Sequence, residues 1–432
     1  MVILLNPVLY CNLRCEYCYA WRHFDKNIKY DKERMFESLK ELIQKWGKNI
    51  SVALHGGEPT LLPIDELEDF FKRLVDLGIR PSIQTNGSLI TDRHIELFKK
   101  YNVSVGISID GFPEENKLRA SPNITKRILL NIVKLRKNGI PVSILSVFHK
   151  YNAGTDERLN NFKRFMLWLK AWGITNGRIL SVTYPGSQYG LPPERIKKVW
   201  KEMTYFIIEN GFHYTPVIDI VNSLLGRSNV VCVFKPCDPF NTIAVDEIQP
   251  DGTVASCMRH ELYQKDDEIL NIREWILYHT PQEYGGCKGC KWFPYCYGGC
   301  SANGINGDWR NRDANCLIYK TIFETVENIM RYLGMEPVKK NWLDELRLPE
   351  YFKSYYSSSK SIDHLDGIEH IDGTIRHLDS NIYNVNYNKT IQGHLDGIEH
   401  TDGGIRHLDS NILPNHTDGI EHLDGGWRHL DG

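Results

Sequence analysis

Three cysteines near the N-terminus, Cys11, Cys15 and Cys18, are spaced Cys-x3-Cys-x2-Cys, and Tyr17 directly precedes the last of them. Three thiolates this close can hold three irons of a cubane iron–sulfur cluster. The fourth iron is then open to bind and reduce a ligand. A structural zinc ion is the alternative, but zinc sites favour paired Cys-x2-Cys units and a fourth ligand. The spacing therefore favours an open iron–sulfur cluster.

The other eight cysteines follow a second pattern between Cys232 and Cys316. Within it, Cys287-x2-Cys290 alone would be half of a zinc site, but a run of eight favours larger metal centres. The chain has eleven cysteines and lacks a basic segment at its start, where we read a strand and no signal peptide. We therefore expect a reducing, cytoplasmic location and metal ligation in place of disulfides.

Alternating strands and helices must position these residues. We expect strands at 2–5, 51–54, 81–84, 103–109, 142–147 and 178–182, and helices at 32–46, 64–77, 92–100, 124–137, 157–172 and 193–210. Strict alternation implies an α/β fold with a parallel sheet. Six units fall short of an eightfold barrel, so we predict an open, partial (β/α)6 TIM-like barrel with its chemistry at the C-terminal strand ends.

Composition divides the chain further. We predict the partial barrel with a bridging helix at 1–228, a loop-rich domain stapled by metal clusters at 229–335 and a linker at 336–356. In the loop-rich domain, helical periodicity returns only at 321–333. The tail, 357–432, lacks an apolar face that could build a core, so we expect it to be disordered. No apolar run is long enough to span a membrane, and we expect neither membrane nor nucleic acid as a partner.

The first cysteine motif, with Tyr17 in its aromatic position, resembles that of the radical S-adenosylmethionine (SAM) enzymes. Further segments at the strand ends are similar to family motifs. The resemblance implies that Gly56, Gly57, Glu58 and Pro59 bind the methionine amino group, and that Thr85, Asn86, Ser108, Asp110 and Arg119 contact the SAM carboxylate or ribose. Each segment could alternatively be only a turn cap.

The resemblance also implies the reaction. SAM would chelate the open iron, and the reduced cluster would cleave SAM to methionine and a 5′-deoxyadenosyl radical that abstracts hydrogen from carbon. The cofactor supplies the reactivity, while the protein orients the substrate and excludes water. We expect an electron donor such as flavodoxin or ferredoxin.

The eight-cysteine pattern, with Gly252 five residues before Cys257, resembles the SPASM extension of this family. By that resemblance, Cys232, Cys237, Cys257 and Cys300 ligate one auxiliary [4Fe–4S] cluster and Cys287, Cys290, Cys296 and Cys316 another, making three clusters in all. No cysteine is then left as a hydrogen donor, which counts against epimerisation. Met258 stands where sulfatase-modifying relatives carry an Asp general base, which counts against sulfatase maturation.

Nine His-x-Asp units, each followed by Gly or Ser, fill the tail. Their residues are His364 and Asp366, His370 and Asp372, His377 and Asp379, His394 and Asp396, His400 and Asp402, His407 and Asp409, His416 and Asp418, His422 and Asp424, and His429 and Asp431. The tract could be a disordered metal-binding segment, a small repeat fold, or a fused substrate of the enzyme. We favour the last, because SPASM enzymes often mature ribosomal peptides with iterated motifs.

We therefore predict a radical SAM/SPASM maturase that cross-links its own tail. The motif resembles the substrates of three-residue cyclophane-forming enzymes, and the product would join an imidazole carbon to the Asp β-carbon. Residues 361–432 carry 4 basic and 13 acidic residues, against 48 and 41 elsewhere, so the tail can dock weakly on the basic body. The alternatives are a maturase of a separate peptide, with epimerisation or tyrosine-directed chemistry, and an electron-transfer protein with a metal-binding His tail.

Overall fold

The computed structural model describes residues 1–340 except 19, 21–24, 26, 28, 48–49, 183–186, 228–231, 240–241, 243, 258 and 260–271, and beyond residue 340 only six short strands. Residues 1–348 form one compact unit and residues 349–432 a second. Among the described residues, no helix has the length and apolar character needed to cross a membrane.

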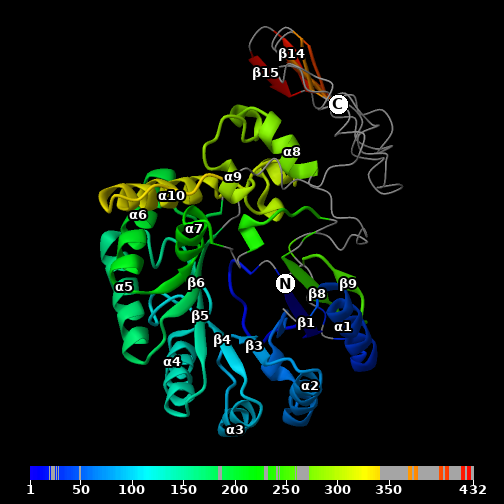
Figure 1. Cartoon of the computed structure of the whole chain (residues 1–432), viewed down its shortest axis with the longest axis vertical. Coiled ribbons are helices and arrows are strands. Elements are labelled where there is room, and N and C mark those ends of the chain that lie inside the picture. Colours follow the sequence, from blue (N-terminus) through cyan, green and yellow to red (C-terminus); the bar gives the residue numbers. More distant parts are fainter. Residues whose placement is uncertain are drawn as a thin grey trace. The chain divides into compact units, whose positions relative to one another are not determined.

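A nine-stranded sheet forms the centre of the first unit, in the order β7-β6-β5-β4-β3-β2-β1-β8-β9. Figure 1 shows helices α1 to α5 around the outside of this curved sheet. The strands are β1 (Val2–Val8), β2 (Ser51–Gly56), β3 (Pro81–Thr85), β4 (Ser104–Ser108), β5 (Val142–Phe148), β6 (Asn176–Ser181), β7 (His213–Thr215), β8 (Val245–Ile248) and β9 (Val254–Ala255). All neighbours pair in parallel except β8 and β9, which are antiparallel.

The helices between the strands follow the amphipathic periods of the sequence. They are α1 (Lys32–Trp46), α2 (Ile64–Asp76), α3 (Asp92–Lys100), α4 (Pro122–Lys137), α5 (Asp156–Ala171) and α6 (Pro193–Glu209). Side-chain caps start α1 and α5, where Asp31 accepts from the backbone N–H of Arg34 and Thr155 from that of Arg158. The buried faces of these helices share one hydrophobic core with the alternate strand residues that point outward from the sheet.

The six expected strand–helix units are therefore confirmed, with boundaries shifted by a few residues at most. The sheet also has three strands that were not predicted, because β7 extends one edge and β8 and β9 extend the other. β8 lies after the domain boundary predicted at residue 229, yet it pairs in parallel with β1. Trp46 of α1 also donates its indole N–H to Asp246 of β8, at 2.8 Å. The predicted division at residue 229 is thus crossed by the main sheet.

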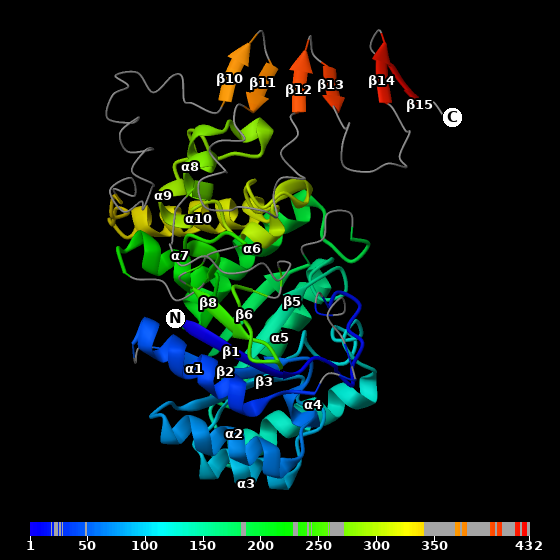
Figure 2. The same ribbon diagram turned by 90° about the vertical axis from the view of Figure 1, so that its right-hand side faces the viewer.

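Short helices and turns dominate the region that follows. They include α7 (Val217–Leu224), α8 (Ile272–His279), α9 (Phe293–Cys296) and the longer α10 (Cys316–Tyr332). The helical period expected at 321–333 is confirmed by α10, which begins five residues earlier, at Cys316. α10 packs against α6 and α7, and Ile322 and Phe323 join the core of the barrel (Figure 2). This packing ties the cysteine-rich region to the sheet.

The described part of the tail consists of three two-stranded antiparallel hairpins. They are formed by β10 (Ile368–Ile371) with β11 (Thr374–His377), β12 (Ile398–Thr401) with β13 (Gly404–His407), and β14 (Ile420–Leu423) with β15 (Gly426–His429). We expected the tail to be largely disordered, and in these strands the backbone is regularly paired. In each hairpin the sequence between the strands is Asp-Gly, a strong signal for a two-residue turn.

Candidate functional site

The loop Cys11–Cys18 follows β1 and is held at its Cys11 end by the turn after β3. The side-chain amide of Asn86 lies 3.6 Å from the Cys11 sulfur and donates to the Asn12 side-chain oxygen at 2.9 Å. Asn12 in turn donates to Ser88 at 3.0 Å. The predicted residue Asn86 therefore lies beside the first cysteine and fixes the start of the loop.

The glycines after β2 allow two backbone segments to touch. A Cβ on Gly57 would lie 2.0 Å from the carbonyl oxygen of Tyr10, and one on Gly56 2.2 Å from that of Val8. The N–H groups of Gly57 and Glu58 donate to the carbonyls of Val8 and Tyr10, at 2.7 and 3.0 Å. Only glycine permits this approach, so the pair places the segment 56–58 directly against the residues that lead into Cys11.

Glu58 is fully buried, and its carboxylate braces the surrounding turns. It accepts hydrogen bonds from the backbone N–H and hydroxyl of Thr60, from the Thr85 hydroxyl and from the backbone N–H of Asn86, all between 2.6 and 3.0 Å. Burial raises the pKa of Glu58, although these bonds oppose the rise. The role expected for Glu58, binding an ammonium, stays a prediction, because both carboxylate oxygens already have protein partners.

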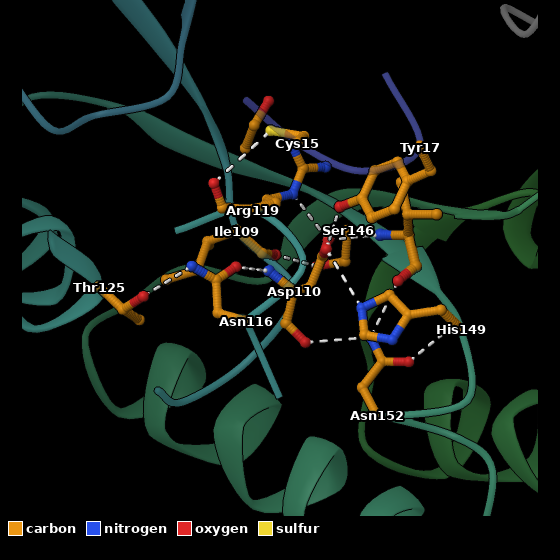
Figure 3. A network of polar contacts seen from close by, with 12 residues as sticks. Cys15, Tyr17, Ile109, Asp110, Asn116, Arg119, Thr125, Ser146, His149 and Asn152 are labelled. Atoms are coloured by element: carbon orange, nitrogen blue, oxygen red, sulfur yellow. Dashed lines mark hydrogen bonds and ion pairs between the residues drawn. The ribbon is translucent and has the colours of Figure 1, made fainter. Parts of the chain in front are cut away.

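The other end of the cysteine loop is tied to a buried network around Asp110 (Figure 3). The backbone N–H of Glu16 donates to the carbonyl of Leu118 at 2.9 Å, and the Cys15 thiol lies 3.9 Å from the carbonyl of Arg119. Tyr17 donates its hydroxyl to Asp110, and its ring lies under the Arg119 guanidinium at 5.3 Å. The loop is thus held between the ends of β3 and β4.

Asp110 is fully buried and surrounded by donors. Its Oδ1 receives the backbone N–H of Val147 at 2.7 Å and pairs with Arg119 Nε at 2.9 Å, while His149 Nε2 faces Oδ2 at 3.4 Å. Burial acts to raise the pKa of Asp110, but Arg119, His149 and Tyr17 together hold it below its ordinary value. Asp110 is therefore a carboxylate that positions Tyr17 and Arg119.

Three members of this network were not predicted from the sequence. His149 accepts the backbone N–H of Tyr151 on Nδ1 at 3.1 Å, so a neutral ring carries its proton on the Nε2 that faces Asp110. Asn152 donates to the carbonyl of Asp110, and Asn116 accepts the Asp110 N–H. The available signal was the polar stretch His149–Asn152 directly after β5, where parallel sheets gather functional residues.

The remaining predicted contacts lie near by, on the same edge of the sheet. Pro59 begins the 3₁₀ turn Pro59–Leu61, and the Ser108 hydroxyl at the end of β4 accepts from Gln84 at 2.9 Å. His55 directly precedes the glycine pair, and burial lowers its pKa to about 4. Its buried Nδ1 has no hydrogen-bond partner within the described parts of the chain. An orphaned ring nitrogen beside this motif fits a bound polar cofactor.

The eleven cysteines meet in three separate groups. Cys15 interacts electrostatically with both Cys11 and Cys18. In the second group Cys300 interacts with Cys232, and Cys237 and Cys257 interact with Cys300. In the third, Cys296 interacts with Cys287, Cys290 and Cys316. These groups have the same members as the three ligand sets expected from the sequence.

All four cysteines of the third group line one small cavity. Trp292, Tyr319 and Phe323 form much of the rest of the wall. Burial raises the pKa of Cys15, Cys237 and Cys287 to about 12, so these thiols are protonated at neutral pH and would have to release their protons to bind a metal. Across the described residues, no three Cys, His, Asp or Glu side chains meet closely enough for a single metal ion. Ligands of a multi-iron cluster bind different irons and stand further apart, which suits this arrangement.

Two arginines accompany the second group and were also missed by sequence reasoning. Arg178 of β6 is directed at the Cys232 sulfur, with Nη2 at 3.8 Å. Arg259 lies 3.9 Å from the Cys300 sulfur and donates to the Asn303 side chain at 2.6 Å. A positive charge beside a thiolate stabilises it, so this group lies in a more positive setting than burial alone would give.

Some residues singled out in the sequence lie outside the described residues. They are Met258, the nine aspartates of the tail repeat and the histidines His364, His394 and His416. The histidines His370, His377, His400, His407, His422 and His429 lie in the hairpin strands.

Comparison with known proteins agrees with the barrel and its cysteine loop. Residues 5–165 match the radical SAM superfamily. The cysteine-type anaerobic sulfatase-maturating enzyme of Clostridium novyi (strain NT) is 25% identical over 363 residues, which cover 75% of this chain and 94% of that protein. A serine-type anaerobic sulfatase-maturating enzyme of Bacteroides thetaiotaomicron is 30% identical over 178 residues, 35% of this chain and 41% of that protein.

Solved structures share the fold. Native anSMEcpe with bound AdoMet and Cp18Cys peptide has a TM-score of 0.61 at 22% identity, covering 77% of this chain and 99% of that chain. The chain therefore carries a radical SAM domain over residues 5–165, in an α/β fold that it shares with a sulfatase-maturating enzyme. These likenesses support an enzyme that uses SAM and a [4Fe–4S] cluster.

Proposed function

We propose that this chain is a radical SAM peptide maturase that holds three [4Fe–4S] clusters and cross-links His-x-Asp units of its own tail. The observation that carries the proposal is the division of all eleven cysteines into groups of three, four and four. A group of three leaves one iron of a cubane open, whereas two complete groups of four suit electron transfer.

When bound, the first cluster and SAM together supply a 5′-deoxyadenosyl radical that removes a hydrogen atom from carbon. The protein's own residues hold the site in shape. Asn86 and the glycine pair fix the Cys11 end of the loop, and the Asp110 network fixes the Cys15 and Tyr17 end. Arg119 and His55 offer polar groups at the same strand ends for SAM.

Cross-linking one unit forms a carbon–carbon bond between the Asp β-carbon and an imidazole carbon. Each product loses two hydrogens, one as the abstracted atom and the other as a proton and an electron. Clusters held by the two groups of four cysteines would accept that electron. The tail contains no cysteine, so a thioether within it is excluded.

Mass spectrometry of the anaerobically reconstituted full chain tests the proposal. We expect about twelve iron atoms per chain, since three cubane clusters hold four each, and a loss of two hydrogens for each modified unit after turnover with SAM and reductant. The Cys11→Ala, Cys15→Ala, Cys18→Ala variant should keep about eight iron atoms and leave the tail mass unchanged. SAM consumption by the wild type with an unaltered tail would reject the cross-link.

Sulfatase maturation is the second candidate, because the Clostridium novyi relative carries that name and is covered over 94% of its length. In this chain, Met258 stands at the position expected for an Asp base. Incubation with a sulfatase peptide that carries the target Cys or Ser distinguishes the two functions. Formation of formylglycine would favour this candidate over tail cross-linking.

A further inference from the structure

Three cations surround one tyrosine at the C-terminal edge of the sheet. The Lys117 ammonium lies 3.9 Å from the centre of the Tyr151 ring, and Lys150 and Arg158 each lie 5.2 Å from it. Lys150 also lies 5.3 Å from the ring of Tyr189. We call these five residues the basic patch. They come from the connections after β4, β5 and β6 and from the first turn of α5.

Within the described residues, these cations form no ion pair of their own. In the described part of the chain, no carboxylate comes within ion-pair distance of Lys117, Lys150 or Arg158. The nearby Asp156 is already paired with Arg195 and Lys198, and the buried Glu115 accepts from Asn161. The Tyr151 ring attracts each cation, but three like charges around it still repel one another. Such an arrangement is completed by an anionic ligand.

The basic patch borders the cysteine loop. The backbone N–H of Tyr151 donates to His149, which faces Asp110. Tyr189 donates its hydroxyl to Glu16 at 3.2 Å, and Glu16 lies between Cys15 and Cys18. An acidic peptide held on the patch would therefore lie next to the expected position of SAM.

We propose that the basic patch docks the acidic segment 361–432 of this chain. That segment has 13 acidic and 4 basic residues, so it carries the charge that the patch lacks. The tyrosine faces add apolar surface for the Gly, Leu and Ile residues between the acids. This inference rests on the proposed function, because it takes the tail as the substrate. It adds the surface that would hold each His-x-Asp unit next to the expected SAM site.

Carbodiimide coupling, which joins a lysine amine to a carboxylate only when the two are in contact, tests docking in the full chain without turnover. We expect Lys117 and Lys150 to couple to acids of residues 361–432, and Lys126, exposed on α4, to remain uncoupled. Raising the salt to about 1 M should abolish coupling, because screening then acts within about 3 Å. Coupling that is equal at Lys126, or absent at the patch, would overturn the proposal.

Charge reversal provides the matched comparison. Arg158→Glu leaves both amines in place and should reduce their coupling to the tail by about fivefold or more, in line with a screened charge effect. Arg127→Glu, an exposed position on α4, should not. Arg158 also donates to the carbonyl of Lys150, so Lys117→Glu, which disturbs no such bond, serves as a second variant with Lys150 as reporter.

The outcomes separate this inference from the proposed function. If the lysines of the patch couple to the tail but the tail mass is unchanged after turnover, the docking proposal is supported and the cross-link is rejected. If the tail loses hydrogens in pairs but does not couple to the patch, the cross-link is supported and the docking proposal is rejected. A separate phosphorylated peptide or nucleotide that displaces the tail at low concentration would identify a different occupant and also reject it.

Discussion

Asp110 shows how a residue expected to contact a cofactor can act by positioning its neighbours. Replacing it with Asn leaves Arg119, only 10% exposed, without its carboxylate partner. Breaking a buried ion pair on one side costs about 3–5 kcal/mol. Asp110→Asn should therefore lower the free energy of unfolding by about that much, as measured with denaturant.

Asp92→Asn is the matched control for that variant. Asp92 pairs with Lys134 at 3.2 Å, but its side chain is 82% exposed, and exposed pairs contribute only about 0–1 kcal/mol. Equal effects of the two substitutions would contradict the positioning role assigned to Asp110.

Arg178 provides a second prediction at the residue scale. Its guanidinium lies 3.8 Å from the Cys232 sulfur and is partly buried, so it stabilises additional negative charge there. Arg178→Gln should make the cluster that we propose for the second cysteine group harder to reduce, while Arg178→Lys should recover part of the change. Redox titration followed by electron paramagnetic resonance measures this directly. An unchanged potential in the Gln variant would show that the charge plays no part.

The sequence indicated how the cysteines group but not what surrounds them, for one physical reason. Ligand spacing such as Cys-x3-Cys-x2-Cys is a local property, and it is visible in the chain. The approach of Arg178 to Cys232 or of His149 to Asp110 depends on residues brought together only by the folded sheet. Likewise, Glu58 has a suggestive motif, but its four hydrogen bonds become visible only when Thr60, Thr85 and Asn86 are placed around it.

Among the elements, the junction of β1 and β2 is the most sensitive to added volume. Gly57→Ala places a methyl group 2.0 Å from the Tyr10 carbonyl, so the two segments must separate just before Cys11. Overpacking of this kind costs about 1–3 kcal/mol. We expect a lower melting temperature and weaker SAM binding by calorimetry. Gly190→Ala, where the nearest atom is 3.3 Å away, should have a much smaller effect on both quantities.

The long elements were predictable because burial and helical period coincide in them. α1 and α3 have the predicted bounds, and β1 to β6 begin within two residues of their expected starts. β7, β8 and β9 have only two to four residues each, too few to show a period, and β8 joins the sheet through its partner β1. The tail hairpins were missed because their polar composition outweighed the Asp-Gly turns.

At the scale of the whole molecule, the tail forms hairpins and, by our proposal, also docks on the basic patch. Its hairpin register repeats, with Glu369 opposite Arg376, Glu399 opposite Arg406 and Glu421 opposite Arg428. Opposite charges at these register positions favour this pairing. A strand paired in a hairpin is less available to the basic patch, so docking and hairpin formation should compete.

Attachment of the tail also sets the kinetics of its own modification. A tethered substrate has an effective concentration of about millimolar, well above the enzyme concentrations of an assay. Tail modification within one chain should therefore be first order, with the same rate per enzyme over a tenfold dilution. A rate that falls in proportion to dilution would mean that each chain modifies the tail of another. Mixing isotopically labelled wild type with the unlabelled Cys11→Ala, Cys15→Ala, Cys18→Ala variant provides the control, because modification of the variant's tail can occur only between chains.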